Sequence, residues 1–148
     1  MSNILLATDG SKPSLRAEEF LSNTYDPSVD EVIVVSVAHI PSRLITDLGL
    51  GEEGTDPYES EVGKNFVENA SDHGEDAAER LRAEGFSVDV STPTGTPGPE
   101  LCEVADERDV SCIVMGRRGM NSESDPSVGS VSQYVLHHAS CPVNVVPL

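Results

Sequence analysis

The chain has few basic residues. Among its 148 residues, lysine and arginine account for 9 and aspartate and glutamate for 26, which gives a formal net charge of −17. The lysines are Lys12 and Lys64. A surface of this charge repels DNA, RNA and anionic lipid, so neither a nucleic acid nor a membrane is expected as a partner.

The acidic residues are spread along the chain, which argues against a local acidic interaction segment. At molar salt the Debye length shrinks to about 3 Å, and this screening relieves the repulsion between like charges. The composition therefore favours a salt-rich cytoplasm, as in a halophile. The alternative is an ordinary acidic protein whose stability does not depend on salt.

Long hydrophobic runs are also missing. The longest, residues 32–35 and two runs near the termini, are far too short to span a membrane. Residues 1–11 have no basic segment ahead of their apolar stretch, so we expect a soluble, cytoplasmic protein. A chain of 148 residues with 37% hydrophobic content is long enough for one core and short for two. We therefore expect a single domain over residues 1–148.

Cysteine is scarce as well. Cys102, Cys112 and Cys141 form no Cys-x-x-Cys pair and are odd in number, so they are expected to be reduced core residues. The histidines are scattered, and His137 and His138 are adjacent, so on a helix they point in different directions. We expect no metal site. One surface and one core histidine is the favoured interpretation of this pair, and a two-histidine ligand pair is the alternative.

Apolar segments alternate with amphipathic segments along the chain. Residues 4–8 and 32–37 are continuous apolar runs, typical of strands buried on both faces, whereas residues 86–90 alternate with polar positions and predict an exposed or edge strand. Residues 39–58 are rich in glycine, proline and acids and predict no regular element. The predicted strands are residues 4–8, 32–37, 86–90, 113–115 and 143–146, with helices beginning near Pro13, Val62, Leu101 and Val131.

This order, βαβαβαβαβ, predicts an α/β fold: an open, parallel, five-stranded, Rossmann-like sheet with helices on both faces. Ligands of such sheets bind beyond the carboxyl ends of the strands, where the strand order reverses. Asp9, Val37 and Gly116 all lie at predicted strand ends. One cleft could therefore gather them.

Residues 115–132, MGRRGMNSESDPSVGSVS, contain the most informative pattern. Gly116 and Gly119 are followed, nine residues later, by Gly129-Ser130, placed between a strand and a helix. Glycine lets a phosphate approach the backbone, and a helix start offers unpaired N–H groups and a positive dipole end. The hydroxyls of Ser130 and Ser132 could add donors. A Gly-x-x-Gly pair alone is also typical of tight turns; the whole spacing favours phosphate binding.

On these residues the chain resembles the universal stress protein family over nearly its whole length. The resemblance is carried by residues 7–11 (ATDGS), 35–37 (VSV), 115–119 (MGRRG), 129–132 (GSVS) and 140–146 (SCPVNVV). In that family, the spacing Gly-x2-Gly-x9-Gly-Ser separates members that bind ATP from members that do not. The resemblance thus implies ATP, with or without Mg²⁺, as the ligand.

The resemblance also implies roles for individual residues. Asp9 would bond near the nucleoside, with Ala7 beside it, and Val37 would present backbone groups to the adenine edge. Met115 and Gly116 would lie under the ribose and α-phosphate. The phosphate chain would be held by backbone amides of Gly119, Gly129, Ser130 and Val131. Family members typically form homodimers through the last strand, here Pro142 to Val146.

The segment between Gly119 and Gly129 departs from the family pattern. It is polar and carries Glu123 and Asp125, where ATP-binding relatives usually have leucines and a basic residue. The two carboxylates would repel a triphosphate unless they hold Mg²⁺ with it, and the other interpretation is salt-adapted surface. Arg117 and Arg118 could bond to phosphate, and we favour Arg118 because it adjoins Gly119.

Three functions fit these features: an ATP-binding regulatory protein acting as a dimer in the stress response, a relative without nucleotide that serves as a structural or partner-binding dimer, or an enzyme of nucleotide activation. No catalytic residue is predicted, because the chain has no Gly-x-x-x-x-Gly-Lys motif and no lysine near the glycines. At most, a slow ATPase or self-phosphorylation is conceivable. The glycine and serine spacing favours the first function, and the acidic segment favours the second.

Overall fold

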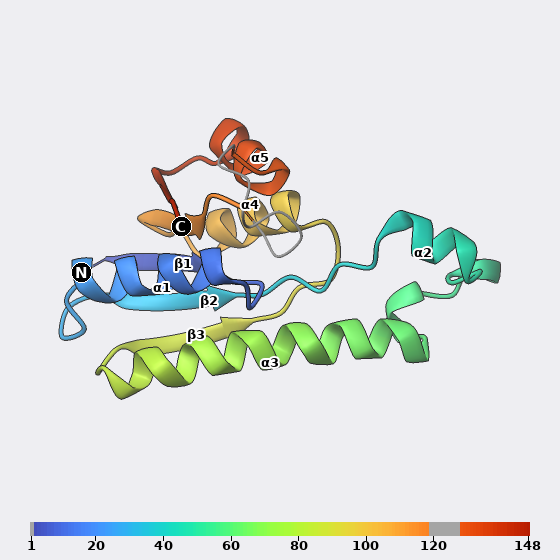
Figure 1. The fold of residues 1–148 in the computed structure, drawn as a ribbon, viewed down its shortest axis with the longest axis horizontal. Coiled ribbons are helices and arrows are strands. Elements are labelled where there is room, and N and C mark those ends of the chain that lie inside the picture. The colour runs from blue at the N-terminus through green and yellow to red at the C-terminus, as the bar shows by residue number, and fades with distance from the viewer. Residues whose placement is uncertain (1, 119–127) are drawn as a thin grey trace.

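A computed structural model describes residues 2–118 and 128–148. Its five strands form one parallel sheet in the order β3-β2-β1-β4-β5 (Figure 1). This confirms the predicted fold. In chain order the elements are β1 (Asn3–Ala7), α1 (Lys12–Thr24), β2 (Glu31–Val35), α2 (Ser42–Asp47), α3 (Glu61–Ala83), β3 (Ser87–Ser91), α4 (Pro97–Glu107), β4 (Cys112–Gly116), α5 (Ser130–His138) and β5 (Val143–Val146).

Helices cover both faces of the sheet, and the alternation along each strand decides which face a side chain meets. In β1, Ile4 and Leu6 pack with Leu21 of α1 and Leu81 of α3. Leu5 instead joins a second cluster with residues of α4 and α5. Both clusters contain fully buried side chains, which explains why the central strands read as continuous apolar runs.

The strand order reverses between β1 and β4. From β1 the chain winds outward through β2 to β3, then crosses back to build β4 and β5 on the other side. Ile4 thus pairs with Val32 on one side and with Cys112 on the other. The carboxyl ends of β1 and β4 flank the position where such sheets bind ligands.

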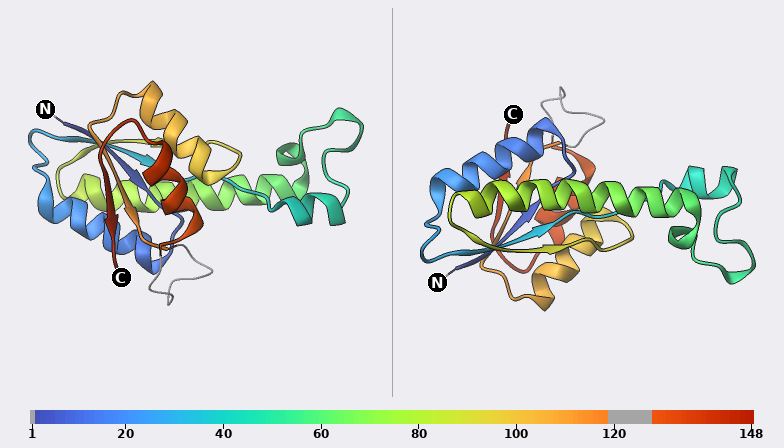
Figure 2. Two further views of the ribbon diagram at one scale, coloured as in Figure 1. Left: turned by 90° about the horizontal axis from the view of Figure 1, so that it is seen from above. Right: turned by 90° about the horizontal axis from the view of Figure 1, so that it is seen from below.

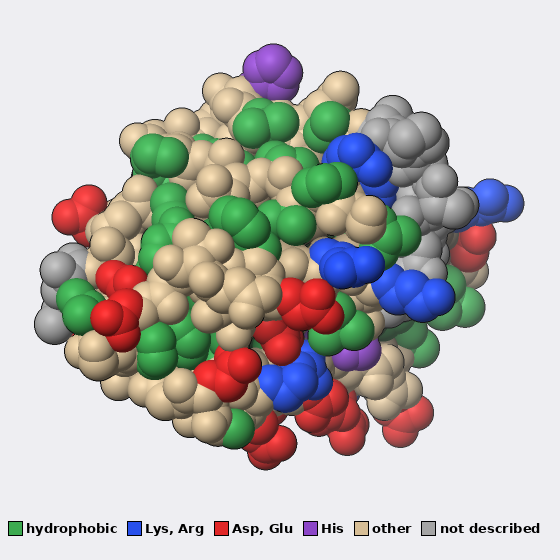
Figure 3. All heavy atoms as spheres, turned by 60° about the vertical axis from the view of Figure 1, so that its left-hand side comes forward, with side chains coloured by type: hydrophobic (Ala, Val, Ile, Leu, Met, Phe, Trp, Pro, Cys, Tyr) green, Lys and Arg blue, Asp and Glu red, His purple; other side chains and the backbone are tan. Residues whose placement is uncertain are grey.

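The two edge strands are the least buried. β3 forms one edge and alternates between exposed and half-buried residues, as predicted for residues 86–90. β5 forms the other edge, and all of its residues are half-buried. Figure 3 brings forward the side of the molecule where both chain ends lie, and hydrophobic and uncharged side chains occupy much of that surface.

Residues 39–58 are not irregular throughout, so that prediction was wrong. They contain α2 and two single turns of 3-10 helix, Glu52–Gly54 and Pro57–Glu59. Together with the start of α3 they project away from the sheet (Figures 1 and 2). None of the α2 residues is buried. Because this helix is short and packs into no core, it lacks the periodic burial signal from which a helix can be predicted.

Two smaller predictions also need correction. α4 begins at Pro97, before the predicted start near Leu101, because proline suits a first helical turn. α3 runs through Gly74 without a break; a Cβ there would lie 3.0 Å from Val90 Cγ1, so the glycine permits close packing of helix on sheet. Of the cysteines, Cys112 is buried as expected, but Cys102 and Cys141 are only half-buried. In the part of the chain that the structure describes, no helix is both long and apolar enough to cross a bilayer.

Candidate functional site

A pocket of about 750 Å³ opens beyond the carboxyl ends of β1, β2 and β4. Its walls come from the segments that follow these strands, from the first turns of α4 and α5, and from one face of α3. Every predicted site residue that the structure describes lines this pocket. They are Ala7, Asp9, Val37, Met115, Gly116, Arg118, Gly129, Ser130 and Val131. Gly119 and the acidic segment with Glu123 and Asp125 lie outside the described residues.

The α5 end of the pocket offers unpaired backbone donors. Gly129 is the N-cap of α5 and has no side chain that could accept from the first-turn amides. The amides of Ser130, Val131 and Ser132 make no hydrogen bond to any described residue. Together with the positive end of the helix dipole, these donors create a site that attracts an anion.

Two groups expected to face a phosphate are already engaged. The Gly129 amide donates to the Arg117 carbonyl at 2.8 Å. The Ser132 hydroxyl is buried and donates to the Gly116 carbonyl at 2.9 Å and to the Arg117 carbonyl at 3.1 Å. These bonds attach α5 to the end of β4. By contrast, Ser130 is exposed, and its hydroxyl makes no hydrogen bond to a described residue.

The two arginines occupy different positions. Arg118 lines the pocket, and its Nη1 donates to the Val128 carbonyl at 3.4 Å. Arg117 is not among the lining residues, and its Nε is buried without a partner among the described atoms. Of the two, Arg118 is therefore the one in position to contact a bound anion.

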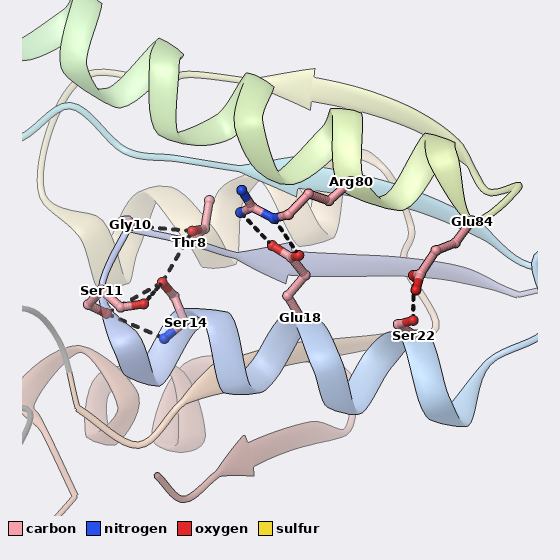
Figure 4. Close-up of polar contacts among 8 residues, drawn as sticks. All are labelled: Thr8, Gly10, Ser11, Ser14, Glu18, Ser22, Arg80 and Glu84. Carbon is pink, nitrogen blue, oxygen red and sulfur yellow. Dashed lines mark hydrogen bonds and ion pairs between the residues drawn. The ribbon is translucent and has the colours of Figure 1, made fainter.

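The turn after β1 is ordered by short side chains (Figure 4). Thr8 Oγ1 accepts from the Gly10 amide at 3.3 Å. Asp9, which the figure does not draw, accepts through Oδ1 from the Ser11 amide at 3.0 Å. Ser11 caps α1, its Oγ accepting from the Ser14 amide at 3.3 Å. One carboxylate oxygen of Asp9 thus fixes the turn, and the side chain stays on the exposed rim of the pocket.

The β2 end of the pocket has a different character. The amides of Ser36 and Ala38 donate to carbonyls on the β3 side, those of Ser91 and Pro93. Between them, the N–H and C=O of Val37 make no hydrogen bond to any described residue. Since β1 has ended at this level, one donor and one acceptor of the same peptide segment stay open beside apolar walls that include Ala38, Phe66, Ala70 and Leu101.

Sequence reasoning missed several lining residues. Four of them lie at helical spacing on one face of α3: Phe66, Asn69, Ala70 and His73. The sequence showed this periodicity only for the apolar residues Phe66 and Ala70. Further missed residues come from the end of β2, from the turn and helix start after β3, and from α5, and they include His39, Thr96, Pro97, Gly98, Pro99 and Tyr134. The Pro-Gly-Pro run was the available signal, because it follows a strand end.

The thiols are poor candidates for nucleophilic chemistry. Burial raises the pKa of Cys102 and of Cys141, which keeps both in the unreactive thiol form at neutral pH. Neither lines the pocket. Within residues 2–118 and 128–148, no three His, Cys, Asp or Glu side chains group closely enough to hold a metal ion.

A doubly wound parallel sheet with a glycine-lined pocket at the point where the strand order reverses is typical of Rossmann-like α/β proteins. The model of the universal stress protein family matches residues 1–147, and the chain belongs to that family. Universal stress protein MJ0531 of Methanocaldococcus jannaschii is 31% identical over 150 residues, covering 97% of this chain and 80% of the relative.

Two solved structures show how widely the fold is shared. That of MJ0577, from the same organism, superposes with a TM-score of 0.83 at 26% identity, covering 99% of this chain and 96% of that one. A universal stress protein from Archaeoglobus fulgidus, solved in complex with dAMP, has a TM-score of 0.66 at 21% identity, covering 99% and 97% of the two chains. The second likeness concerns the fold alone.

Proposed function

We propose that this protein binds an adenine nucleotide, ATP, in the pocket at the reversal point and acts as a nucleotide-dependent regulatory dimer in the stress response. The observation that supports the proposal most strongly is that one pocket has two chemically different ends. Unpaired helix amides with Arg118 lie at one end, and the open peptide groups of Val37 lie at the other.

The Val37 end suits adenine. Adenine presents an amine donor next to a ring nitrogen acceptor, and these match the Val37 C=O and N–H. Guanine presents a carbonyl and a protonated ring nitrogen at the same positions, which would place acceptor against acceptor and donor against donor. The apolar walls around this end would cover the faces of the base.

The α5 end suits the phosphates. The amides of Ser130 and Val131 and the Ser130 hydroxyl would donate to phosphate oxygens, with Arg118 adding a charged donor. Asp9 would bond to a nucleoside hydroxyl, beside Ala7 and Met115. β2 and β4 are separated by β1, so the two ends lie roughly 10 Å apart at two strand spacings. Mg²⁺ enters this proposal only as the ion that accompanies ATP.

The dimer in this proposal forms through residues 142–146. β5 is an edge strand whose inner side bonds to β4, through the Pro142 and Val146 carbonyls. By alternation, Val143 and Val145 direct their backbone groups outward, where a second copy could pair. The half-buried residues of this edge strand support the arrangement.

The setting in this proposal is the cytoplasm of a halophile. Its support is the excess of acidic over basic residues, 26 against 9. In molar salt the repulsion among these charges is screened over about 3 Å.

The function is tested by denaturing protein purified in high salt and analysing the small molecules released. Close to one adenine nucleotide per chain is expected, together with calorimetric binding of ATP and Mg²⁺ to the emptied protein. If no nucleotide is released and none binds, the alternative applies: a relative that serves as a structural or partner-binding dimer without nucleotide.

A further inference from the structure

His39 lies at the Val37 end of the pocket, and one of its two ring nitrogens already makes a hydrogen bond. It follows β2, is half-buried and lines the pocket. Its Nδ1 lies 2.9 Å from the Gly95 carbonyl oxygen. A carbonyl oxygen only accepts, so Nδ1 must carry the proton of this bond. In the neutral ring Nε2 is therefore an acceptor, and no described residue bonds to it.

The orientation of the ring is fixed from both sides of the same turn. The Gly95 amide donates to the Ala38 carbonyl at 3.0 Å, while the Gly95 carbonyl accepts from His39. Gly95 has a φ of +143°, and a Cβ there would lie 2.7 Å from Glu100 Oε1. The turn that holds His39 is thus held by its own backbone bonds, in a conformation that favours glycine, and this pre-organises the ring.

His39 and the open peptide of Val37 are two residues apart. Ala38 between them bridges to Thr94, so this segment stays extended beyond the end of β2. In an extended segment, residues i and i+2 lie on the same side, and both residues line the pocket. The Val37 carbonyl and His39 Nε2 are therefore two acceptors at the same end of the pocket.

We propose that His39 is a specificity residue that reads the exocyclic amine of the base. The inference rests on the proposed function. An adenine amine has two hydrogens, and the Val37 carbonyl can accept only one of them along its N–H direction. His39 Nε2 accepts the other. A purine with a carbonyl at this position offers no hydrogen to either acceptor and leaves both desolvated and unpaired, which disfavours guanine and hypoxanthine nucleotides.

A purely structural role for His39 makes a different prediction. If the ring only ties the end of β2 to Gly95, its removal would weaken all nucleotides by the same factor. If His39 instead accepts a hydrogen bond from the amine, its removal would weaken the binding only of ligands that carry the amine. The ratio of two affinities separates these cases, whereas one affinity does not.

The test compares ATP with purine riboside triphosphate, which has hydrogen in place of the amine, by calorimetry on the wild type, His39→Phe and His73→Phe. His73 is the matched control because it lines the same pocket, with its ring against Gly10. In His39→Phe the preference for ATP is expected to fall about threefold to tenfold, the effect of one hydrogen bond. In His73→Phe it is expected to stay unchanged.

An unchanged preference in His39→Phe, or an equal loss in both variants, overturns the assignment while leaving nucleotide binding intact. If the wild type binds neither nucleotide, the proposed function itself fails. A measurement on the wild type covers the case in which His39→Phe does not fold: the ¹⁵N resonance of His39 Nε2 is expected to shift on adding ATP and not on adding purine riboside triphosphate. Equal shifts with both ligands contradict the proposal.

Discussion

The Ser132 hydroxyl donates to the Gly116 carbonyl at 2.9 Å and so joins the first turn of α5 to the last residue of β4. The Gly129 amide makes a parallel link to the Arg117 carbonyl at 2.8 Å. These bonds cross from strand to helix and aim the open amides of α5 at the pocket. The direction of the open α5 amides therefore depends on groups that are already bonded to the end of β4.

Ser132→Ala should lower the free energy of unfolding by about 1 kcal/mol, because it leaves the buried Gly116 carbonyl and the half-buried Arg117 carbonyl with one partner fewer. It should also weaken ATP binding, since the α5 amides lose one of their anchors. Ser130→Ala is the control: the Ser130 hydroxyl is exposed, so this change should weaken ATP without altering stability. Urea unfolding and calorimetry measure both quantities. Equal stability loss in the two variants would contradict this account.

Gly129→Asp should separate stability from binding. Gly129 has the extended backbone of an N-cap, with φ −72° and ψ 165°, so aspartate in that place would accept from the first-turn amides. Its Cβ would lie 3.2 Å from the Arg117 carbonyl oxygen, which offsets this gain, so the free energy of unfolding should change by no more than a few tenths of a kcal/mol. The same carboxylate would accept from the α5 amides that bind phosphate in the proposed function, and its charge would repel the phosphate. The affinity for ATP should therefore fall roughly tenfold or more. Gly129→Asn is the matched neutral cap and should lose less affinity. If both variants bind ATP like the wild type, phosphate does not lie at this helix end.

Glu18 of α1 and Arg80 of α3 form a two-pronged ion pair across one face of the sheet (Figure 4). The bonds are 2.7 and 2.9 Å, and the Glu18 side chain is only 11% exposed. Hydrogen bonding to Glu18 raises the pKa of Arg80, opposed in part by burial of the guanidinium. Removing the arginine would leave a nearly buried carboxylate without its partner.

Arg80→Met should therefore destabilise the fold by about 1–3 kcal/mol, the range for a buried acceptor left without its partner. Arg43→Met is a suitable comparison, because the Arg43–Asp47 pair is 3.7 Å long and its side chains are 92% and 63% exposed. That change should have no measurable effect on urea unfolding. A similar response of both variants would mean that burial of Glu18 does not matter.

Val145→Pro should dissociate the proposed dimer and leave the monomer folded. Proline at this position removes an amide that points away from β4, so the internal ladder is kept while the outer edge is blocked. Asn144→Pro removes an amide directed at β4 and should instead unfold the edge. Sedimentation at several concentrations distinguishes the two. A wild type that sediments as a monomer, or a Val145→Pro variant that stays dimeric, would exclude pairing through this strand.

Dilution from molar potassium chloride into low salt should lower the unfolding temperature sharply, because 26 acidic residues face only 9 basic ones. Sucrose at matched osmolality is the control, since it stabilises folded chains without screening charge. Indifference to salt would show that the acidic surface is not an adaptation to a salt-rich cytoplasm.

The sheet could be predicted from the sequence because burial on both faces leaves continuous apolar runs, as in Ile33 and Val34 of β2. α2 could not, because it contributes no buried residue. Its only marks in the sequence are the preceding Pro41 and the apolar pair Leu44 and Ile45, which a loop can also contain.

The glycine-rich half of the pocket could be predicted because its residues are neighbours in the sequence. The other half could not be found in this way. His39, His73 and Gly98 come from three separate segments, and only the winding of the chain brings them to one pocket. Nor could the sequence reveal that the Gly129 amide is already bonded, since this depends on where the Arg117 carbonyl points.

The middle position of β1 has a consequence for synthesis on the ribosome. One neighbour of Ile4 is Val32, but the other is Cys112, so β1, β2 and β3 can assemble long before β4 emerges. Until β4 is made, one edge of β1 has unpaired backbone groups that can bond to a wrong strand. The pocket needs the strands on both sides of β1, so the proposed nucleotide would stabilise only a nearly complete chain and not a growing one.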